Sequence, residues 1–235
     1  MSGRSGKVYV TKLAAAQRQL CAAIRMFFDG EDELAVHTVA SAAFGILRDL
    51  KAERGRDEAA DNYLNAVFYA VRDYRRGTLP GYLADDPQMM KWIRDMANRM
   101  PISASSQYED VAASVSPGLA QDFWRKRNAV SNFLKHADRD AKSHISLDEV
   151  DNLWLLTQAS GSYLDLTDDN LGAEGFVLWV YGNAVRGMKE GMPRKFRGLA
   201  SSIEKLEPDE QIRFCSQWLH EMKKVTPPPT STMRS

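Results

Sequence analysis

Two stripes of polar residues carry the groups in this chain that could do chemistry. One stripe consists of Asn128, Asn132 and Lys135, with His136 at its edge. Residues three or four apart share one face of a helix. Asparagine offers a paired hydrogen-bond donor and acceptor, and the charge of a half-buried histidine can change near neutral pH. This face would suit a ligand or a partner protein, although a merely solvated helix face has the same pattern.

The second stripe lies nearer the N-terminus and contains His37, Ser41 and Arg48, flanked by Thr38 and Gly45. Small residues here would allow a ligand or another backbone to approach closely. We expect the two stripes to face one another and to form one polar pocket that holds an anion or polarises a bond. The alternative is that His37 is a core histidine whose ring is hydrogen-bonded to a neighbour.

A nuclease is the main alternative to a binding function. Arg139 and His144 have the spacing of the arginine–histidine motif of the HEPN superfamily of helical ribonucleases, which they resemble. In such a site arginine stabilises phosphate charge and histidine transfers a proton, without a metal. The same pattern recurs at Arg213 and His220, so the motif arises easily by chance. Only under this alternative do we expect a nucleic-acid partner.

The segment 138–149, "DRDAKSHISLDE", has the length of a calcium-binding EF-hand loop. Lys142 stands where an oxygen ligand belongs, and Ser143 stands where glycine normally makes the turn. We therefore expect the segment to cap helices, with Ser146 and Glu149 forming a capping box at the start of the next helix. No metal site and no cofactor are expected.

The composition excludes several classes of protein. Among 235 residues, 31 basic side chains balance 31 acidic ones, which argues against a polybasic membrane binder or a nucleic-acid coat. Cys21 and Cys215 are too few and too far apart for a disulfide framework or a zinc site, and we expect buried free thiols in a reducing cytosol. No apolar run approaches the roughly 20 residues of a membrane span. These features predict a soluble, cytoplasmic protein that does not bind membranes; a homo-oligomer is possible.

The elements that must position the stripes are helices, because apolar residues recur with helical periodicity throughout. We predict an all-α fold, an irregular bundle of about eight or nine helices, with the first helix ending at Asp29–Gly30. The predicted domain is 10–224, preceded by a flexible segment 1–9 and followed by a disordered tail 225–235. A boundary inside this domain is possible within 101–117. Four aromatic residues at helical spacing are predicted to lie in the core: Trp154, Phe176, Trp179 and Trp218. The predicted helices are 10–28, 31–53, 57–75, 87–99, 117–137, 146–163, 173–188, 194–205 and 208–224.

Two segments, "VHTVASAAFGILRDL" (36–50) and "NFLKHADRD" (132–140), resemble a family of uncharacterised bacterial all-helical proteins. The resemblance covers about the first two thirds of the chain. It implies a helical fold and a bacterial origin but no established activity. Because no catalytic motif is complete, we predict a helical binding or regulatory module that recognises a partner protein or a small ligand.

Overall fold

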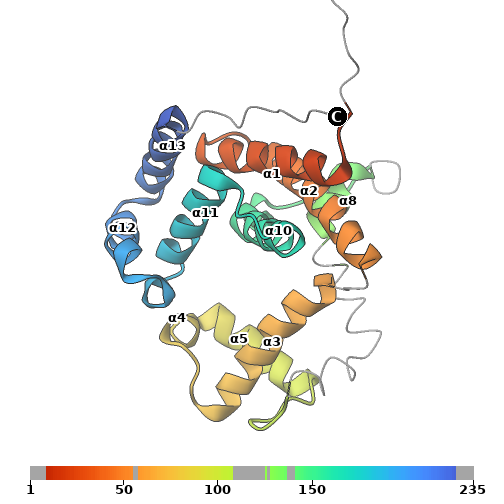
Figure 1. The fold of residues 1–235 in the computed structure, drawn as a ribbon. Helices are drawn as coiled ribbons and strands as arrows, with labels where there is room; N and C mark the ends of the chain where they lie inside the picture. The colour runs from red at the N-terminus through yellow and green to blue at the C-terminus, as the bar shows by residue number, and fades with distance from the viewer. Residues whose placement is uncertain (1–8, 55–57, 108–124, 126–127, 137–140, 226–235) are drawn as a thin grey trace, which may run out of the picture. The chain divides into compact units, whose positions relative to one another are not determined.

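The computed structural model describes residues 9–54, 58–107, 125, 128–136 and 141–225 (Figure 1). Every regular element within these residues is a helix, which confirms the predicted all-α, multi-helix fold. None of these helices combines the length and the apolar character that crossing a membrane requires.

The helices fall close to the predicted ranges, except that the helix predicted at 146–163 begins at Asn152 and that one short helix, α4, was not predicted. Of the predicted helix 117–137, residues 117–124, 126, 127 and 137 lie outside the described part of the chain. The α-helices are α1 (Lys12–Phe28), α2 (Glu33–Glu53), α3 (Glu58–Arg76), α4 (Gly81–Ala84), α5 (Pro87–Arg99), α8 (Ala129–Lys135), α10 (Asn152–Thr167), α11 (Gly172–Val185), α12 (Arg194–Glu204) and α13 (Pro208–Val225). Two 3₁₀ turns, η1 (Leu147–Glu149) and η2 (Lys189–Gly191), join them.

The chain divides into two compact units. The first unit contains residues 1–50 and 134–235, and the second contains residues 51–133. Residues 108–117, most of the predicted boundary segment, lie outside the part of the chain that is described. The prediction of a single domain therefore stays a prediction.

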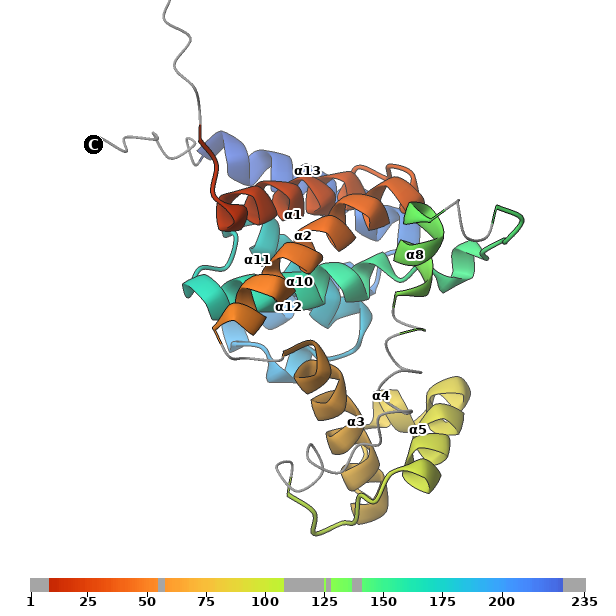
Figure 2. The ribbon, with the colours of Figure 1, turned by 90° about the vertical axis from the view of Figure 1, so that its right-hand side faces the viewer.

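Helix α11 lies at the centre of the first unit, where it packs against α1, α10, α12 and α13 (Figure 1). Its sequence, "GAEGFVLWVYGNAV", is apolar around most of its circumference, as expected of a helix covered on several sides. Helices α1 and α13 lie side by side in both views (Figure 2). Burial of a large side chain such as Phe28 or Leu156 in this core stabilises the fold by about 1.5–3 kcal/mol.

The predicted end of the first helix is confirmed by its backbone geometry. Gly30 has a φ of 70°, in the left-handed region that glycine adopts without strain. Its N–H donates to the carbonyl of Phe27, and the N–H of Glu31 donates to the carbonyl of Met26 at 3.0 Å. This pair of bonds is a Schellman motif, which satisfies the last carbonyls of α1 and turns the chain towards α2.

The predicted start of the helix at Ser146 is wrong. Ser146 accepts a hydrogen bond from the N–H of Asp148, but it caps only the 3₁₀ turn η1. Val150 then adopts an extended conformation that interrupts the helix. Helix α10 begins at Asn152, where Asp151 caps it by accepting a hydrogen bond from the N–H of Trp154 at 2.8 Å.

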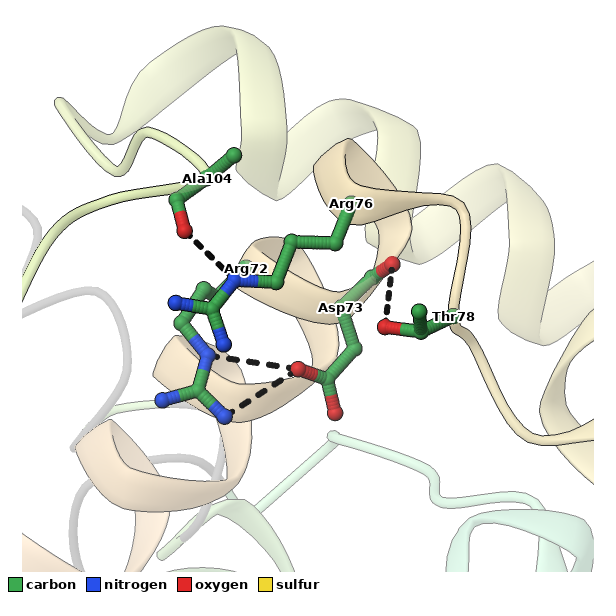
Figure 3. Close-up of polar contacts among 5 residues, drawn as sticks. All are labelled: Arg72, Asp73, Arg76, Thr78 and Ala104. Atoms are coloured by element: carbon green, nitrogen blue, oxygen red, sulfur yellow. Dashed lines mark hydrogen bonds and ion pairs between the residues drawn. The ribbon is translucent and has the colours of Figure 1, made fainter.

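The second unit has its own apolar cluster, formed by α3, α5 and the segment after α5. Arginines at the end of α3 bind both parts: Arg75 donates to the carbonyl of Ala97 in α5 at 2.6 Å, and Arg76 donates to the carbonyl of Ala104 in the segment after α5. Figure 3 shows Arg72 and Arg76 side by side, with Arg72 paired to Asp73. These contacts give the arginine cluster a structural role within this unit.

Candidate functional site

A pocket opens between α10, α11, η2 and α12, and all of its lining residues belong to the first unit. Its volume is about 770 Å³. Most of the lining is apolar or aromatic, with a few polar groups. The lining residues are Thr157, Ser160, Gly161, Leu164, Asn170, Gly175, Phe176, Leu178, Trp179, Gly182, Asn183, Arg186, Met188 and Phe196.

Three aromatic rings form one wall of the pocket. Phe176 stacks on Trp179 with ring centroids 6.2 Å apart, and the edge of Phe196 meets both rings. Trp179 is 40% exposed, so its predicted place in the core is wrong. The physical reason is that α11 is covered on most sides but not on the side where the pocket opens. Phe176, by contrast, packs partly buried against the core as predicted.

Two glycines leave the space that the pocket occupies. A Cβ atom added at Gly161 would meet nothing within 4 Å. A Cβ atom at Gly182 would reach only ordinary van der Waals contact, 3.9 Å from the Leu153 side chain. A side chain at position 161 would therefore start from open space in the pocket.

The polar groups of the pocket differ in whether they already have hydrogen-bond partners. Thr157 donates to the carbonyl of Leu153 at 2.7 Å, and the Asn183 amide donates to the carbonyl of Trp179 at 2.8 Å. The hydroxyl of Ser160 is shielded from solvent and has no hydrogen-bond partner in the structure. A buried hydroxyl without a partner costs free energy, which a ligand that bonds to it would recover.

Among the described residues that line the pocket, Arg186 is the only ionisable one. It is half-buried at the C-terminal end of α11, where the last carbonyls of the helix favour a positive charge. Within the described residues its side chain forms no hydrogen bond and no ion pair. The guanidinium group is therefore available to a ligand.

A buried carboxylate fixes the start of α11. Glu174, with a side chain only 11% exposed, binds Arg25 of α1 at 2.5 Å and Lys223 of α13 at 2.7 Å. Burial alone would raise the pKa of Glu174, but hydrogen bonds from Lys223, the backbone and Arg25 outweigh burial and lower this pKa. The network holds α11, and with it one wall of the pocket, against two other helices.

The predicted stripe on α2 lies outside this pocket. His37 is buried, and its Nδ1 lies 3.2 Å from Oδ1 of Asn152, whose amide donates to the carbonyl of Glu33. Burial, together with the positive charge of Lys135, lowers the pKa of His37 although the bond to Asn152 acts in the opposite direction. Lys135 and His37 belong to different stripes, and the charge of Lys135 acts on the His37 ring. The geometry of His37 is that of a core histidine with a hydrogen-bonded neighbour.

The other predicted stripe residues have varied surroundings. Ser41 is buried, whereas Arg48 is partly exposed and pairs with Asp49 at 3.0 Å. All four residues in the other stripe are less buried than His37: Asn132 and Lys135 are exposed, and His136 is half-buried like Asn128. None of the stripe residues lines the pocket described above. The polar pocket between the stripes stays a prediction.

The residues of the alternative functions are only partly described. His144 is exposed, while Arg139 lies outside the described residues. Asp138 and Asp140, at the start of the segment with the length of an EF-hand loop, also lie outside them. Elsewhere in the chain where side chains are placed, no three histidine, cysteine or acidic side chains gather as a metal site would require. The nuclease alternative stays a prediction.

The two cysteines are free and not activated as nucleophiles. Burial raises the pKa of the Cys215 thiol to about 12, and burial with the nearby Glu174 charge raises the pKa of Cys21 to about 11. A thiol with such a pKa is protonated at neutral pH and reacts slowly.

Sequence reasoning missed the functional groups of the pocket, chiefly Trp179, Arg186 and Ser160. Gly175 and Gly182 among large apolar residues of α11 were the available signal, because a glycine inside a helix marks close packing or open space. No protein-family model, curated protein or solved structure matches this chain. The resemblance of 36–50 and 132–140 to a bacterial helical family thus stays a prediction.

Proposed function

We propose that this chain is a helical binding module that holds a small, mostly apolar ligand in the pocket between α10, α11 and α12. The observation that carries the proposal is the pocket itself, about 770 Å³ in volume with an aromatic wall and a few polar groups. Pockets that bind small molecules are typically about 300–1,000 Å³ with this same kind of lining. The predicted binding module is retained, but the favoured pocket is mostly apolar and none of the stripe residues lines it.

The chemistry of the lining favours binding over catalysis. The described lining residues include hydroxyl groups, at Thr157 and Ser160, but no histidine, carboxylate, lysine or cysteine. A serine or threonine needs a base within hydrogen-bonding reach to act as a nucleophile. The described lining offers none, so its hydroxyls are suited to accepting a hydrogen bond from a bound molecule or donating one to it.

Burial of apolar surface would supply most of the binding free energy, at about 25 cal/mol per Å² removed from water. Trp179, Leu164 and Met188 are exposed apolar residues that meet in this one pocket. A ligand that covers them would remove this surface from water. A partner protein recognised through another surface stays a prediction.

The experiment is a fluorescence titration of the full chain with N-phenyl-1-naphthylamine, an uncharged apolar probe that brightens when it leaves water. The test variant is Gly161→Leu, because position 161 has open space in the pocket. The matched control is Gly198→Leu, an exposed position on α12 with equally open surroundings that does not line the pocket. Circular dichroism and thermal melts verify that both variants fold.

We expect the wild-type chain and Gly198→Leu to bind the probe with equal affinity. Gly161→Leu should weaken binding by at least about tenfold, because a leucine side chain occupies the volume that the probe needs. Absence of binding to the wild type, or equal binding by all three chains, would contradict the proposed function.

A further inference from the structure

We infer that the ligand is an amphipathic monocarboxylate whose head group binds Arg186 and whose hydrocarbon part lies along α11. This inference rests on the proposed function, because it assigns a chemical class to the ligand of the same pocket. It is drawn from three observations: the single charge of the pocket, its elongated course and its apolar far end.

The charge of the pocket selects an anion. Arg186 is the one ionisable residue of the described lining, it is half-buried, and its side chain has no hydrogen bond or ion pair with any residue of the described ranges. A partly desolvated cation gains more from a charge-assisted hydrogen bond than an exposed one does. Guanidinium matches a carboxylate in shape, since two parallel N–H groups can meet its two oxygens. A neutral or cationic ligand would leave Arg186 without a partner.

The number of charges selects a monoanion. One guanidinium balances one negative charge, and the lining, as far as its residues are described, contains no second cation. A phosphate monoester carries about 1.5–2 negative charges at neutral pH. Part of that charge would be placed against an apolar wall without compensation. A carboxylate leaves no such excess.

The course of the pocket selects a long ligand. The α11 residues that line it share one face of the helix, from Gly175 at one end to Arg186 at the other. Eleven residues of helix correspond to roughly 16 Å at about 1.5 Å per residue. The short connection between α10 and α11 makes the two helices antiparallel neighbours, so Leu164 of α10 lies towards the Gly175 end.

The polarity changes along this course. Arg186 and Asn183 lie at the C-terminal end of α11, whereas Phe176 and Leu164 lie towards the other end. The polar residue at that other end is the uncharged Asn170, whose side-chain oxygen already accepts a backbone hydrogen bond at 3.2 Å. Trp179 lies between them with its ring against Phe176. The order of these groups matches a ligand with a charged head and an apolar tail. Ser160, with its shielded hydroxyl, adds one hydrogen-bonding group within the tail region.

The test compares ligands that share a ten-carbon chain and differ in the head group. Isothermal titration calorimetry with the full chain would measure decanoate, methyl decanoate, decyltrimethylammonium and decyl phosphate. The variants are Arg186→Gln and, as the matched control, Arg213→Gln, an exposed arginine of α13 that does not line the pocket. The naphthylamine probe is titrated into every variant in parallel, which verifies that the pocket is intact.

We expect the wild type to bind decanoate at least about tenfold more tightly than methyl decanoate, the size of effect that one charge-assisted contact produces. Arg186→Gln should remove this preference and leave the affinity for the uncharged probe unchanged. Arg213→Gln should behave as the wild type. Decyltrimethylammonium should bind most weakly.

Three outcomes would overturn the inference. They are equal affinity for decanoate and its methyl ester, tighter binding of decyl phosphate than of decanoate, and the same loss in Arg213→Gln as in Arg186→Gln. In each case the proposed function would still hold if the uncharged probe binds the wild type and Gly161→Leu blocks that binding. If the probe fails to bind and decanoate fails as well, the proposed function is wrong and the inference fails with it.

Discussion

The backbone carbonyl oxygen of Asn170 lies 1.8 Å from the point that a Cβ atom at Gly175 would occupy. No side chain fits at that distance, so the loop before α11 can pack onto the first turns of the helix only because residue 175 is glycine. The loop is itself strained, since Asp168 and Leu171 have φ values of 58° and 63°. Asn170 and Gly175 both line the pocket, and their contact shapes one of its ends.

Replacement Gly175→Ala should therefore destabilise the fold. Alanine is favoured over glycine within a helix by about 1 kcal/mol, but the clash with the Asn170 backbone requires the loop to move. Overpacking of this kind costs about 1–3 kcal/mol, and we expect a net loss in the unfolding free energy. Urea unfolding followed by circular dichroism measures the change.

The control for this prediction is Gly161→Ala, a helical glycine of α10 whose Cβ would meet nothing within 4 Å. Helix propensity alone should act there, so we expect a gain of up to about 1 kcal/mol. A loss at both positions, or at neither, would contradict the packing explanation.

The ion pairs of Glu174 should contribute to stability in a pH-dependent manner. Replacement Glu174→Gln leaves Arg25 and Lys223 without their shared partner. Loss of a buried ion-pair partner costs about 3–5 kcal/mol, but both cations are about one third exposed, so we expect roughly 1–3 kcal/mol. Glu204→Gln, which breaks the more exposed pair with Lys189, should cost less than about 1 kcal/mol.

The sign of the pH effect follows from the lowered pKa of Glu174. The contribution of ionised Glu174 to the unfolding free energy is fully present above the ordinary pKa of 4.5, and it is lost as the pH falls through the pKa of the folded state. Acid unfolding curves of the wild type should therefore fall more steeply below that pH than those of Glu174→Gln. Parallel curves would contradict this account of the network.

The all-α class and several helix ends could be predicted because they depend on local patterns. The range predicted for α5 equals its observed bounds, Pro87–Arg99, and Gly30 correctly predicted the end of α1. The start of α10 could not be predicted in this way. Both Ser146 and Asp151 are good capping residues, and only the extended Val150 between them decides that the helix begins at the second.

The pocket could not be predicted because its residues come together only through tertiary packing. Trp179 and Phe176 have the same apolar character in the sequence, and only the arrangement of α10 and α12 around α11 leaves Trp179 exposed. Arg186 appears in the sequence as an ordinary helix-end cation. The polar stripes attracted attention because histidine and asparagine are chemically versatile, yet His37 has a structural partner in Asn152.

His37 should make the stability depend on pH in the neutral range. Its pKa is lowered mainly by burial, so the folded state favours the neutral ring. The stabilising contribution is present above the ordinary value of 6.5 and is lost as the pH falls through the pKa of the folded state. We expect the unfolding free energy of the wild type to decline below that pH.

Replacement His37→Gln removes the titrating group but keeps a side chain that can bond to Asn152. Its unfolding free energy should change less between pH 7 and pH 5 than that of the wild type. His144→Gln, at an exposed position, serves as the control and should follow the wild type. The ring resonances of His37 in a nuclear magnetic resonance titration should move at a lower pH than those of a histidine in an unfolded peptide.

Trp179 should matter more for binding than for folding, because 40% of its surface is exposed while its ring forms the middle of the pocket wall. Replacement Trp179→Ala should weaken binding of the uncharged naphthylamine probe by about tenfold or more, as expected for loss of a large aromatic contact. Its effect on the unfolding free energy should remain below the roughly 3–5 kcal/mol of a fully buried Trp→Ala change. Trp179→Phe keeps an aromatic ring beside Phe176 and should retain most of the affinity. If Trp179→Ala unfolds the chain, or if alanine and phenylalanine reduce the affinity equally, the aromatic wall is a structural element and not the binding surface.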